Sequence, residues 1–506
     1  MTAPNQAKTI AKRVRAAIAV LLCALVVALC IIPFINSGAS SGKIRLVVDL
    51  HGYTPTTNRT PTADSPDVFN STYYIAEAFM EENPDIEIVW ARTKPVGGMD
   101  AEVAQWFTTQ IAGGTVPAIA FSWGTRYQDR DWYLPLDEYL DVPWQYDGGY
   151  ETWRDVFRDY LWESSAVINA RGEVVGLPLT VYPGASTGYF YNQTAFANAG
   201  IEEVPLTWGE FIDATEALEE AGYVGVAPWL YFDTTTTFDA WVFGSVMSPS
   251  YAGALMDVID YDGNGVMSAA EQARACLEGV FSTEHEYARE LYTNLKYYYT
   301  EMLDPGWASI DYNAQWLNGT VGIREEGLWA IPSENSNVVR NFDYGVFVAP
   351  LVSTDTSQYV NEVTFSNGPY NPEPDLVVNI MKAAVEDDPE MLDAALRFLQ
   401  YLSQPENISL ICIENGGVLG AVKNTRHSNL IDEFIRQKFP VQPNASWPTG
   451  FTDEYTDQMN RSFERWVNGQ LTDEQFFAQV DTIQSQGAAN FVANMGLDTT
   501  GWNIAG

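Results

Sequence analysis

The stretch Gly172–Tyr223, GEVVGLPLTVYPGASTGYFYNQTAFANAGIEEVPLTWGEFIDATEALEEAGY, decides the fold of this chain. After an aromatic run, its residues predict a short helix, Thr194–Ala199, that ends before a glycine. A longer helix is predicted over Trp208–Ala221, with Thr207 and Glu210 in the spacing of a capping box. Several separated positions in this stretch indicate a defined local structure, so the stretch is the starting point for interpreting the rest of the chain.

Strand and helix patterns alternate on both sides of this stretch, which indicates an α/β fold. In open α/β sheets, ligands bind outside the carboxyl ends of the strands. Two such ends carry Tyr53 and the polar loop Ser122–Arg126, so we expect a ligand site there. The predicted strands are Ile44–Leu50, Ile86–Trp90, Pro117–Phe121, Tyr344–Leu351 and Asp375–Ile380, and the main further helices are Thr72–Glu82, Asp100–Ile111, Pro389–Leu402, Glu406–Glu414, Thr452–Asn468 and Thr472–Gln486.

The composition limits the classes of protein to which the chain can belong. Its 506 residues allow two to four domains, and 46% of them are apolar, which is enough for sizeable cores. A net charge of −39, from 27 basic and 66 acidic residues, argues against a nucleic-acid partner, because phosphate binding needs clustered Lys and Arg. The 16 Trp and 27 Tyr residues suit a carbohydrate binder, in which aromatic faces cover the apolar faces of sugar rings.

Residues 1–42 are predicted to be a targeting segment. Basic residues precede an uncharged apolar run, Ala16–Phe34, which as a helix of about 28 Å could span a bilayer. This polarity predicts that the rest of the chain lies outside the cytoplasm. The segment is either a signal peptide cleaved near Ser37–Ala39 or an anchor helix, and Cys23 and Cys30 follow leucines, which disfavours lipidation. We expect an extracytoplasmic protein, secreted or tethered to the outer face of a bacterial cytoplasmic membrane.

The exported part contains two cysteines, Cys276 and Cys412, both in apolar, helix-like sequence. Two cysteines do not make a disulfide framework, and a chain of this size folds without one. We expect both residues to be buried free thiols.

The stretch Gly172–Tyr223 also carries a family signature. Within Tyr191–Phe211, the order Tyr-Asn-x-x-x-Phe-x-x-x-Gly-Ile and then Pro-x-Thr-Trp-x-Glu-Phe resembles the family 1 extracellular solute-binding proteins of carbohydrate ABC importers, of the maltodextrin-binding type. The resemblance implies a two-lobed, periplasmic-binding-protein-like α/β fold with a hinge and an interlobe cleft. It implies a monomeric receptor, not an enzyme, that captures an oligosaccharide and delivers it to the membrane permease subunits of an importer.

The same resemblance implies lobe boundaries and ligand contacts. The N-terminal lobe would comprise 43–188 and 353–422, and the C-terminal lobe 189–352 and 423–506. Trp316–Trp329 resembles the small-residue strand and Gly-x-Trp of the family, in which the tryptophan stacks on a sugar. The residues expected to bind the sugar are Tyr53, Trp123, Arg126, Tyr182, Trp229, Tyr231, Asp233, Trp329, Asn367, Tyr370 and Tyr455.

A calcium loop is predicted at Asp260–Glu271, DYDGNGVMSAAE, outside the usual family pattern. It agrees with a twelve-residue EF-hand loop at each diagnostic position, including the glycine that permits the sharp turn. Helices Tyr251–Ile259 and Ala269–Val280 would flank it, and receptors for alginate and similar oligosaccharides resemble this chain in carrying a single such loop. We expect structural Ca²⁺, bound by Asp260, Asp262, Asn264, the carbonyl of Val266, Ser268 through water, and Glu271.

Two other classes of function stay open at this point. A secreted glycoside hydrolase would need two carboxylates flanking a glycosidic bond, and no such pair stands out in the sequence. A calcium-dependent adhesion or signalling module would also fit a membrane-anchored chain with one EF-hand-like loop.

Overall fold

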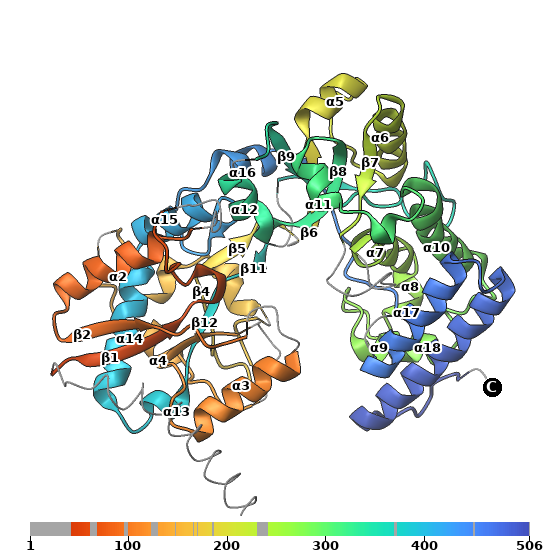
Figure 1. The fold of residues 1–506 in the computed structure, drawn as a ribbon. Helices are drawn as coiled ribbons and strands as arrows, with labels where there is room; N and C mark the ends of the chain where they lie inside the picture. The colour runs from red at the N-terminus through yellow and green to blue at the C-terminus, as the bar shows by residue number, and fades with distance from the viewer. Residues whose placement is uncertain are drawn as a thin grey trace, which may run out of the picture.

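The computed structural model describes residues 42–60, 68–95, 100–122, 130–146, 148–164, 166–169, 171–184, 187–229, 241–337, 339–368, 372–448 and 451–504. These residues form two α/β lobes, each built on its own sheet, with short strands between them (Figure 1). Within these ranges, no helix is both long and apolar enough to cross a membrane. The predicted targeting run, Ala16–Phe34, lies outside them.

The first lobe is built on a five-stranded sheet in the order β2-β1-β3-β12-β4. β1 pairs in parallel with β2 and β3, while β12 runs antiparallel to β3 and β4. Helix α14 lies against β1, and α2 packs against β2 and α15. The elements are β1 (Ile44–Asp49), β2 (Ile86–Trp90), β3 (Ile119–Phe121), β4 (Leu177–Pro178) and β12 (Val377–Ile380), with α2 (Ser71–Glu82), α3 (Asp100–Ala112), α4 (Asp137–Leu140), α13 (Lys382–Val385), α14 (Pro389–Leu402) and α15 (Pro405–Asn415).

The second lobe is built on a four-stranded sheet in the order β7-β8-β6-β9. β7 and β8 are parallel, and β6 runs antiparallel to both β8 and β9. A group of helices that includes α7–α10, α17 and α18 extends from this sheet to the far end of the lobe (Figure 1). The elements are β6 (Thr187–Asn192), β7 (Val224–Ala227), β8 (Val321–Gly327) and β9 (Tyr344–Phe347), with α5 (Gln193–Ala199), α6 (Trp208–Glu220), the π-helix η5 (Val242–Met247), α7 (Ser248–Gly253), α8 (Met256–Ile259), α9 (Ala269–Leu277), α10 (Glu286–Tyr297), the π-helix η6 (Tyr298–Met302), α11 (Tyr312–Leu317), the 3₁₀ turn η8 (Leu328–Ala330), α12 (Ile331–Ser336), α16 (Asn429–Phe434), α17 (Asp453–Val467) and α18 (Asp473–Met495).

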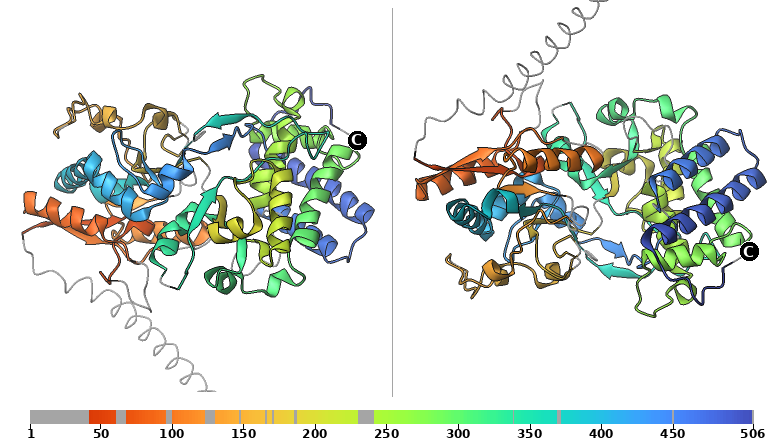
Figure 2. Two further views of the ribbon diagram at one scale, coloured as in Figure 1. Left: turned by 90° about the horizontal axis from the view of Figure 1, so that it is seen from above. Right: turned by 90° about the horizontal axis from the view of Figure 1, so that it is seen from below.

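Small sheets accompany the chain where it passes between the lobes. β5 pairs with β11 and β13, and the next strand along the chain is β6 of the second lobe. β10 pairs with β14, and Figure 2 shows this pair between the two lobes. The strands are β5 (Thr180–Tyr182), β10 (Phe365–Asn367), β11 (Glu373–Pro374), β13 (Leu419–Gly420) and β14 (Lys438–Pro440).

Most of the predicted elements are present. The capping box of α6 forms, with Thr207 accepting from the Glu210 backbone and Glu210 accepting from Thr207. β3, β9 and β12 are shorter than predicted, and α18 runs past the predicted end at Gln486. Cys276 and Cys412 are buried free thiols, as expected.

The predicted helix Tyr251–Ile259 is wrong in one respect, because it is divided into α7 and α8. A tertiary contact lies at the break. A Cβ on Gly253 would come within 2.4 Å of Pro443, so the chain packs closely against another segment there.

Candidate functional site

Three tryptophans gather at the carboxyl end of the parallel pair β7–β8. Trp229 follows β7 by two residues, Trp329 follows β8 by two residues, and Trp241 precedes η5. The Trp229 and Trp241 rings stack, with centroids 4.4 Å apart and planes at 19°, and Trp241 meets Trp329 edge to face at 5.4 Å. We call these three residues the indole cluster. Trp329 is 45% exposed, which leaves much of its side chain open to solvent.

The indole cluster lies at the edge of the sheet that borders the first lobe. Gly327, the last residue of β8, is paired with Thr187, where the chain arrives in the second lobe from β5. The next turn, η8, touches the end of α15 in the first lobe. A Cβ on Gly417 would lie 2.6 Å from the Leu328 carbonyl, so these two segments are in close contact. A ligand on Trp329 would therefore lie near both lobes.

Two residues of β8 hold the cluster in place. A Cβ on Gly327 would come within 2.4 Å of the Trp329 indole, so the ring lies directly over this glycine. Glu325, 2% exposed, accepts a hydrogen bond from the Trp229 backbone N–H at 3.0 Å. Burial raises the pKa of Glu325 to about 7. Neither Glu325 nor Trp241 was predicted from the sequence as a site residue.

The corresponding edge of the first lobe contains a buried ion pair. Lys94 donates to Asp49 and to the Phe121 carbonyl, the latter at 3.0 Å, and thereby joins the ends of β1 and β3. His51 stacks on Phe121 at 4.8 Å. Burial and the nearby Lys94 lower the pKa of His51 to about 4, so this imidazole is neutral at pH 7. His51 therefore does not titrate near neutrality.

Tyr53 and Tyr182, both predicted to contact sugar, are buried beside the crossing strands in this structure. The Tyr53 hydroxyl donates to Asp375, Thr180 donates to the same carboxylate at 2.8 Å, and Asn415 donates to the Tyr53 oxygen at 3.1 Å. Burial raises the pKa of Asp375, and hydrogen bonds from Tyr53, Thr180 and Tyr182 act in the opposite sense. The Tyr53 and Thr180 hydroxyls are therefore occupied in this conformation.

Tyr455, a further predicted sugar contact, lies in the helical part of the second lobe. It is 3% exposed, its hydroxyl donates to the Pro448 carbonyl, and its ring covers Gly487 of α18. Its ring lies between α17 and α18 and presents almost no surface in this structure, so its contact with sugar stays a prediction. Asn367 is exposed on β10, between the lobes. The predicted ligand residues Trp123, Arg126, Tyr231, Asp233 and Tyr370 lie outside the described residues.

The predicted calcium loop brings its acidic residues together. Carboxylate oxygens of Asp260, Asp262 and Glu271 all lie within 4.8 Å of one another. Asp260 accepts from the Gly265 backbone at 2.8 Å, which closes the loop at the expected glycine. Glu271 also forms a capping box with Ser268 at the start of α9. Three clustered carboxylates fit a hard cation such as Ca²⁺. Asn264 and Val266 lie in the same exposed turn.

The loop is tied to the segment that leads into α17. The Met267 N–H donates to the Asn444 carbonyl at 2.9 Å, and Gln272 donates to the carbonyls of Ser446 and Trp447. Trp447 is fully buried. An ion in the loop would therefore stabilise a junction in the helical part of the second lobe. It would lie on elements other than β7 and β8, which carry the indole cluster.

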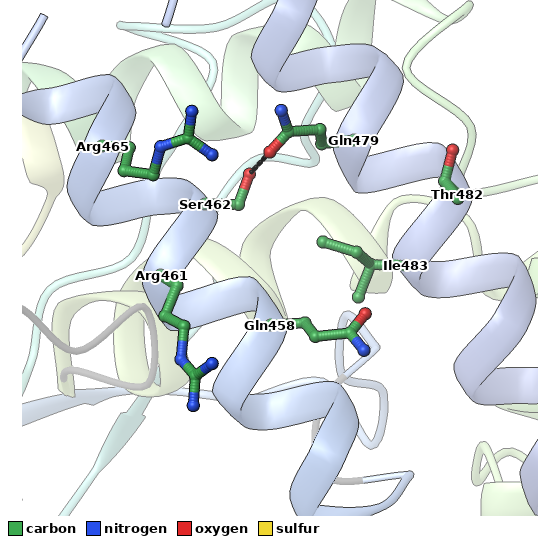
Figure 3. A pocket seen from close by; sticks show the side chains of 7 residues that line it. All are labelled: Gln458, Arg461, Ser462, Arg465, Gln479, Thr482 and Ile483. Atoms are coloured by element: carbon green, nitrogen blue, oxygen red, sulfur yellow. Dashed lines mark hydrogen bonds between the residues drawn. The ribbon is translucent and has the colours of Figure 1, made fainter. Parts of the chain in front are cut away.

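A shallow cavity of about 320 Å³ lies elsewhere, between α17 and α18 (Figure 3). It is lined by polar side chains and by Ile483, and one of the polar residues, Ser462, donates to Gln479 at 2.9 Å. The cavity shares no residue with the indole cluster, so we do not assign the binding function to it.

Two α/β lobes with crossing segments, and an aromatic cluster at the sheet edge beside the crossings, define a two-lobed binding protein. The chain belongs to the bacterial extracellular solute-binding proteins, whose family model matches residues 62–408. No curated protein sequence matches the chain.

Solved structures of this kind share the fold at low sequence identity. The apo form of RafE from Streptococcus pneumoniae is 14% identical, with a TM-score of 0.56 over 89% of this chain and 100% of RafE. An ABC substrate-binding protein from Listeria monocytogenes, in complex with cycloalternan, is 16% identical, with a TM-score of 0.51 over 90% and 100% of the two chains. A family 1 extracellular solute-binding protein from Bifidobacterium longum subsp. infantis is 18% identical, with a TM-score of 0.50 over 88% and 100%.

Proposed function

We propose that this protein captures an oligosaccharide between its lobes and delivers it to the permease subunits of an ABC importer. The observation that carries the proposal is the indole cluster, which offers the partly exposed face of Trp329 beside the first lobe. Aromatic faces of this kind bind the apolar faces of sugar rings, and nearby polar groups set the orientation. The family match supports a receptor that works outside the cytoplasm, either secreted or tethered.

The ligand class is supported by charge and by similar proteins. The chain carries a formal net charge of −39, which opposes the approach of a polyanion at low salt, so we favour a neutral oligosaccharide. One structural neighbour was determined with cycloalternan, and another is described as a chitin oligosaccharide binding protein. We propose a monomer without catalytic activity. The hydrolase alternative predicts shortened products when oligosaccharides are incubated with the pure protein.

A thermal-shift screen against neutral and acidic oligosaccharides tests the proposal. A bound sugar stabilises the folded receptor by RT ln(1 + [L]/Kd), so the melting temperature should rise with sugar concentration, by about 2.7 kcal/mol of stability at a hundred times Kd. A panel of neutral oligosaccharides that leaves the melting temperature unchanged, while an amino acid or peptide raises it, would replace the proposed ligand class.

Gly327 provides a steric test of the cluster. Its φ of −91° suits any residue, so Gly327→Ala introduces only the collision of a methyl group with the Trp329 ring. We expect sugar affinity to fall about tenfold, or about 1.4 kcal/mol, while the fold is retained. Gly244→Ala is the matched control, because its added methyl group meets nothing within 4 Å. Equal affinities for the two variants in titration calorimetry would contradict the assignment.

We also propose that the loop Asp260–Glu271 binds one structural Ca²⁺. The clustering of three carboxylates supports this, together with the agreement of the loop with an EF-hand. The ion would brace the junction with the segment that carries Trp447 and take no part in sugar contact. A single loop with its two flanking helices does not make a paired EF-hand switch. A calcium-dependent adhesion module, the other alternative, would need calcium in order to bind its partner.

Removing calcium gives a measurable stability change. With an affinity on the order of 10⁻⁴ M, about 1 mM calcium should stabilise the protein by roughly 1.4 kcal/mol. Glu271→Gln should remove most of this gain and still allow the capping box, in which Gln replaces Glu. Asp257→Asn, an exposed acid just before the loop, should respond to calcium like the parent. A chelated parent with an unchanged melting temperature would refute the calcium proposal.

A further inference from the structure

Glu325 occupies an unusual place for a carboxylate. It lies on β8 directly opposite Tyr189 of β6, and it is 2% exposed. Successive residues of a strand point to opposite faces. The neighbouring residues Arg324 and Glu326 therefore share the other face, where Arg324 forms ion pairs with Glu326 at 2.7 Å and with Glu334 at 2.9 Å. Within the described ranges, Glu325 itself makes no ion pair.

A buried carboxylate without a cation is costly, so its hydrogen bonds indicate what it does. Oε2 accepts from the Trp229 backbone N–H at 3.0 Å, and the Val242 backbone also helps to stabilise the charged form. Trp229 is one member of the stacked pair, and Val242 immediately follows the other member, Trp241. The carboxylate is thus bound to the main chain of one stacked ring, Trp229, and acts on the backbone of the residue next to the other.

We propose that Glu325 is a positioning residue that sets the Trp229–Trp241 stack, and thereby the surface on which the sugar is bound. The role of the stack rests on the proposed function, whereas the control of the stack by Glu325 does not. A charged acceptor makes a hydrogen bond about twice as strong as a neutral one. The stack should therefore be held most firmly when Glu325 is ionised.

The surroundings of Glu325 make this control sensitive to pH. Burial raises its pKa to about 7, and the adjacent Glu326 acts in the same direction. The other titratable groups that face it are Tyr189 on β6 and Tyr298 and Tyr299 on η6, whose pKa values burial raises well above the usual value for tyrosine. These tyrosines keep their protons throughout the neutral range. Glu325 is therefore the group in this environment that changes charge near pH 7.

Circular dichroism of the stacked indoles tests the proposal without any sugar. Two indoles 4.4 Å apart give a coupled signal, which is identified as the part of the spectrum that Trp241→Phe removes. In the parent, we expect this signal to weaken as pH falls from about 8.5 to 5.5, with a midpoint near 7. Glu325→Gln should give the weak, acid-type signal at every pH, and Glu325→Leu should lose most of the signal.

The outcomes separate positioning from a general structural role. Glu77→Gln, an exposed acid on α2, is the matched control and should keep the pH response of the parent. A full signal in Glu325→Leu, or a parent signal that is constant over this pH range, would overturn the proposal. If Glu325→Leu does not fold, the pH response of parent and Glu325→Gln decides alone. If the spectra behave as predicted but no sugar binds, the receptor function is refuted and the positioning role of Glu325 stands.

Discussion

Trp329→Ala is expected to weaken oligosaccharide binding by about 2 kcal/mol or more, or roughly 30-fold in Kd. The ring is 45% exposed at the end of β8, so its removal takes away contact surface for the ligand without opening the core. Trp229→Ala would remove a stacked and partly buried ring, so its effect would mix binding with local stability. Titration calorimetry with the sugar found by thermal shift measures the effect.

The matched control for Trp329→Ala is Tyr74→Ala. Tyr74 is 59% exposed on α2, on the outer part of the first lobe, and should be neutral for binding. A well-folded Trp329→Ala protein that binds the sugar as tightly as the Tyr74→Ala control would contradict the site assignment. The family membership would be unaffected.

Relative to the parent, the Glu325→Gln variant is expected to gain stability as pH rises. This gain is expected even though the substitution loosens the indole stack. Burial raises the pKa of Glu325 from its usual value near 4.5 to about 7, so the folded protein holds this proton more tightly than the unfolded chain. The parent therefore loses stability from this group as pH rises from about 4.5 to 7, by about 1.4 kcal/mol per pH unit. The variant has no such loss.

The informative quantity is the difference between the free energies of unfolding of variant and parent. This difference should shift in favour of Glu325→Gln by up to about 3 kcal/mol between pH 4.5 and 7.5, and the shared titration of the other acids cancels. Urea unfolding at several pH values measures it. A difference that stays flat with pH, as expected for Glu77→Gln, would show that Glu325 titrates as an ordinary surface acid.

Local signals predicted much of the fold. The capping box of Thr207 and Glu210 defines the start of α6, and Asp388 followed by Pro389 defines the start of α14. Gly487 was misleading, because a glycine after Gln486 indicates a helix end. In the structure it lies inside α18, where a Cβ would come within 2.5 Å of Tyr455. The same contact explains why Tyr455 is buried, and only the packing of two helices reveals it.

The candidate site was predictable only in part. Trp229 and Trp329 follow strands and carry the family pattern, and the structure brings them together through Trp241. Glu325 lies in the sequence Arg-Glu-Glu-Gly at the end of the predicted strand, where three consecutive charged residues give no sign that one of them is buried. Its burial depends on the register that sets it opposite Tyr189, and strand register between distant segments is a tertiary property.

Small-angle scattering with the bound sugar tests the central claim most directly, that the ligand is held between the lobes. Contact with both lobes favours the closed state, so binding should shift the population toward it. We expect the radius of gyration to fall when the oligosaccharide is added at saturating concentration. Trp329→Ala should need a correspondingly higher sugar concentration for the same fall. An unchanged radius in a sample in which calorimetry shows full binding would contradict capture of the sugar between the lobes.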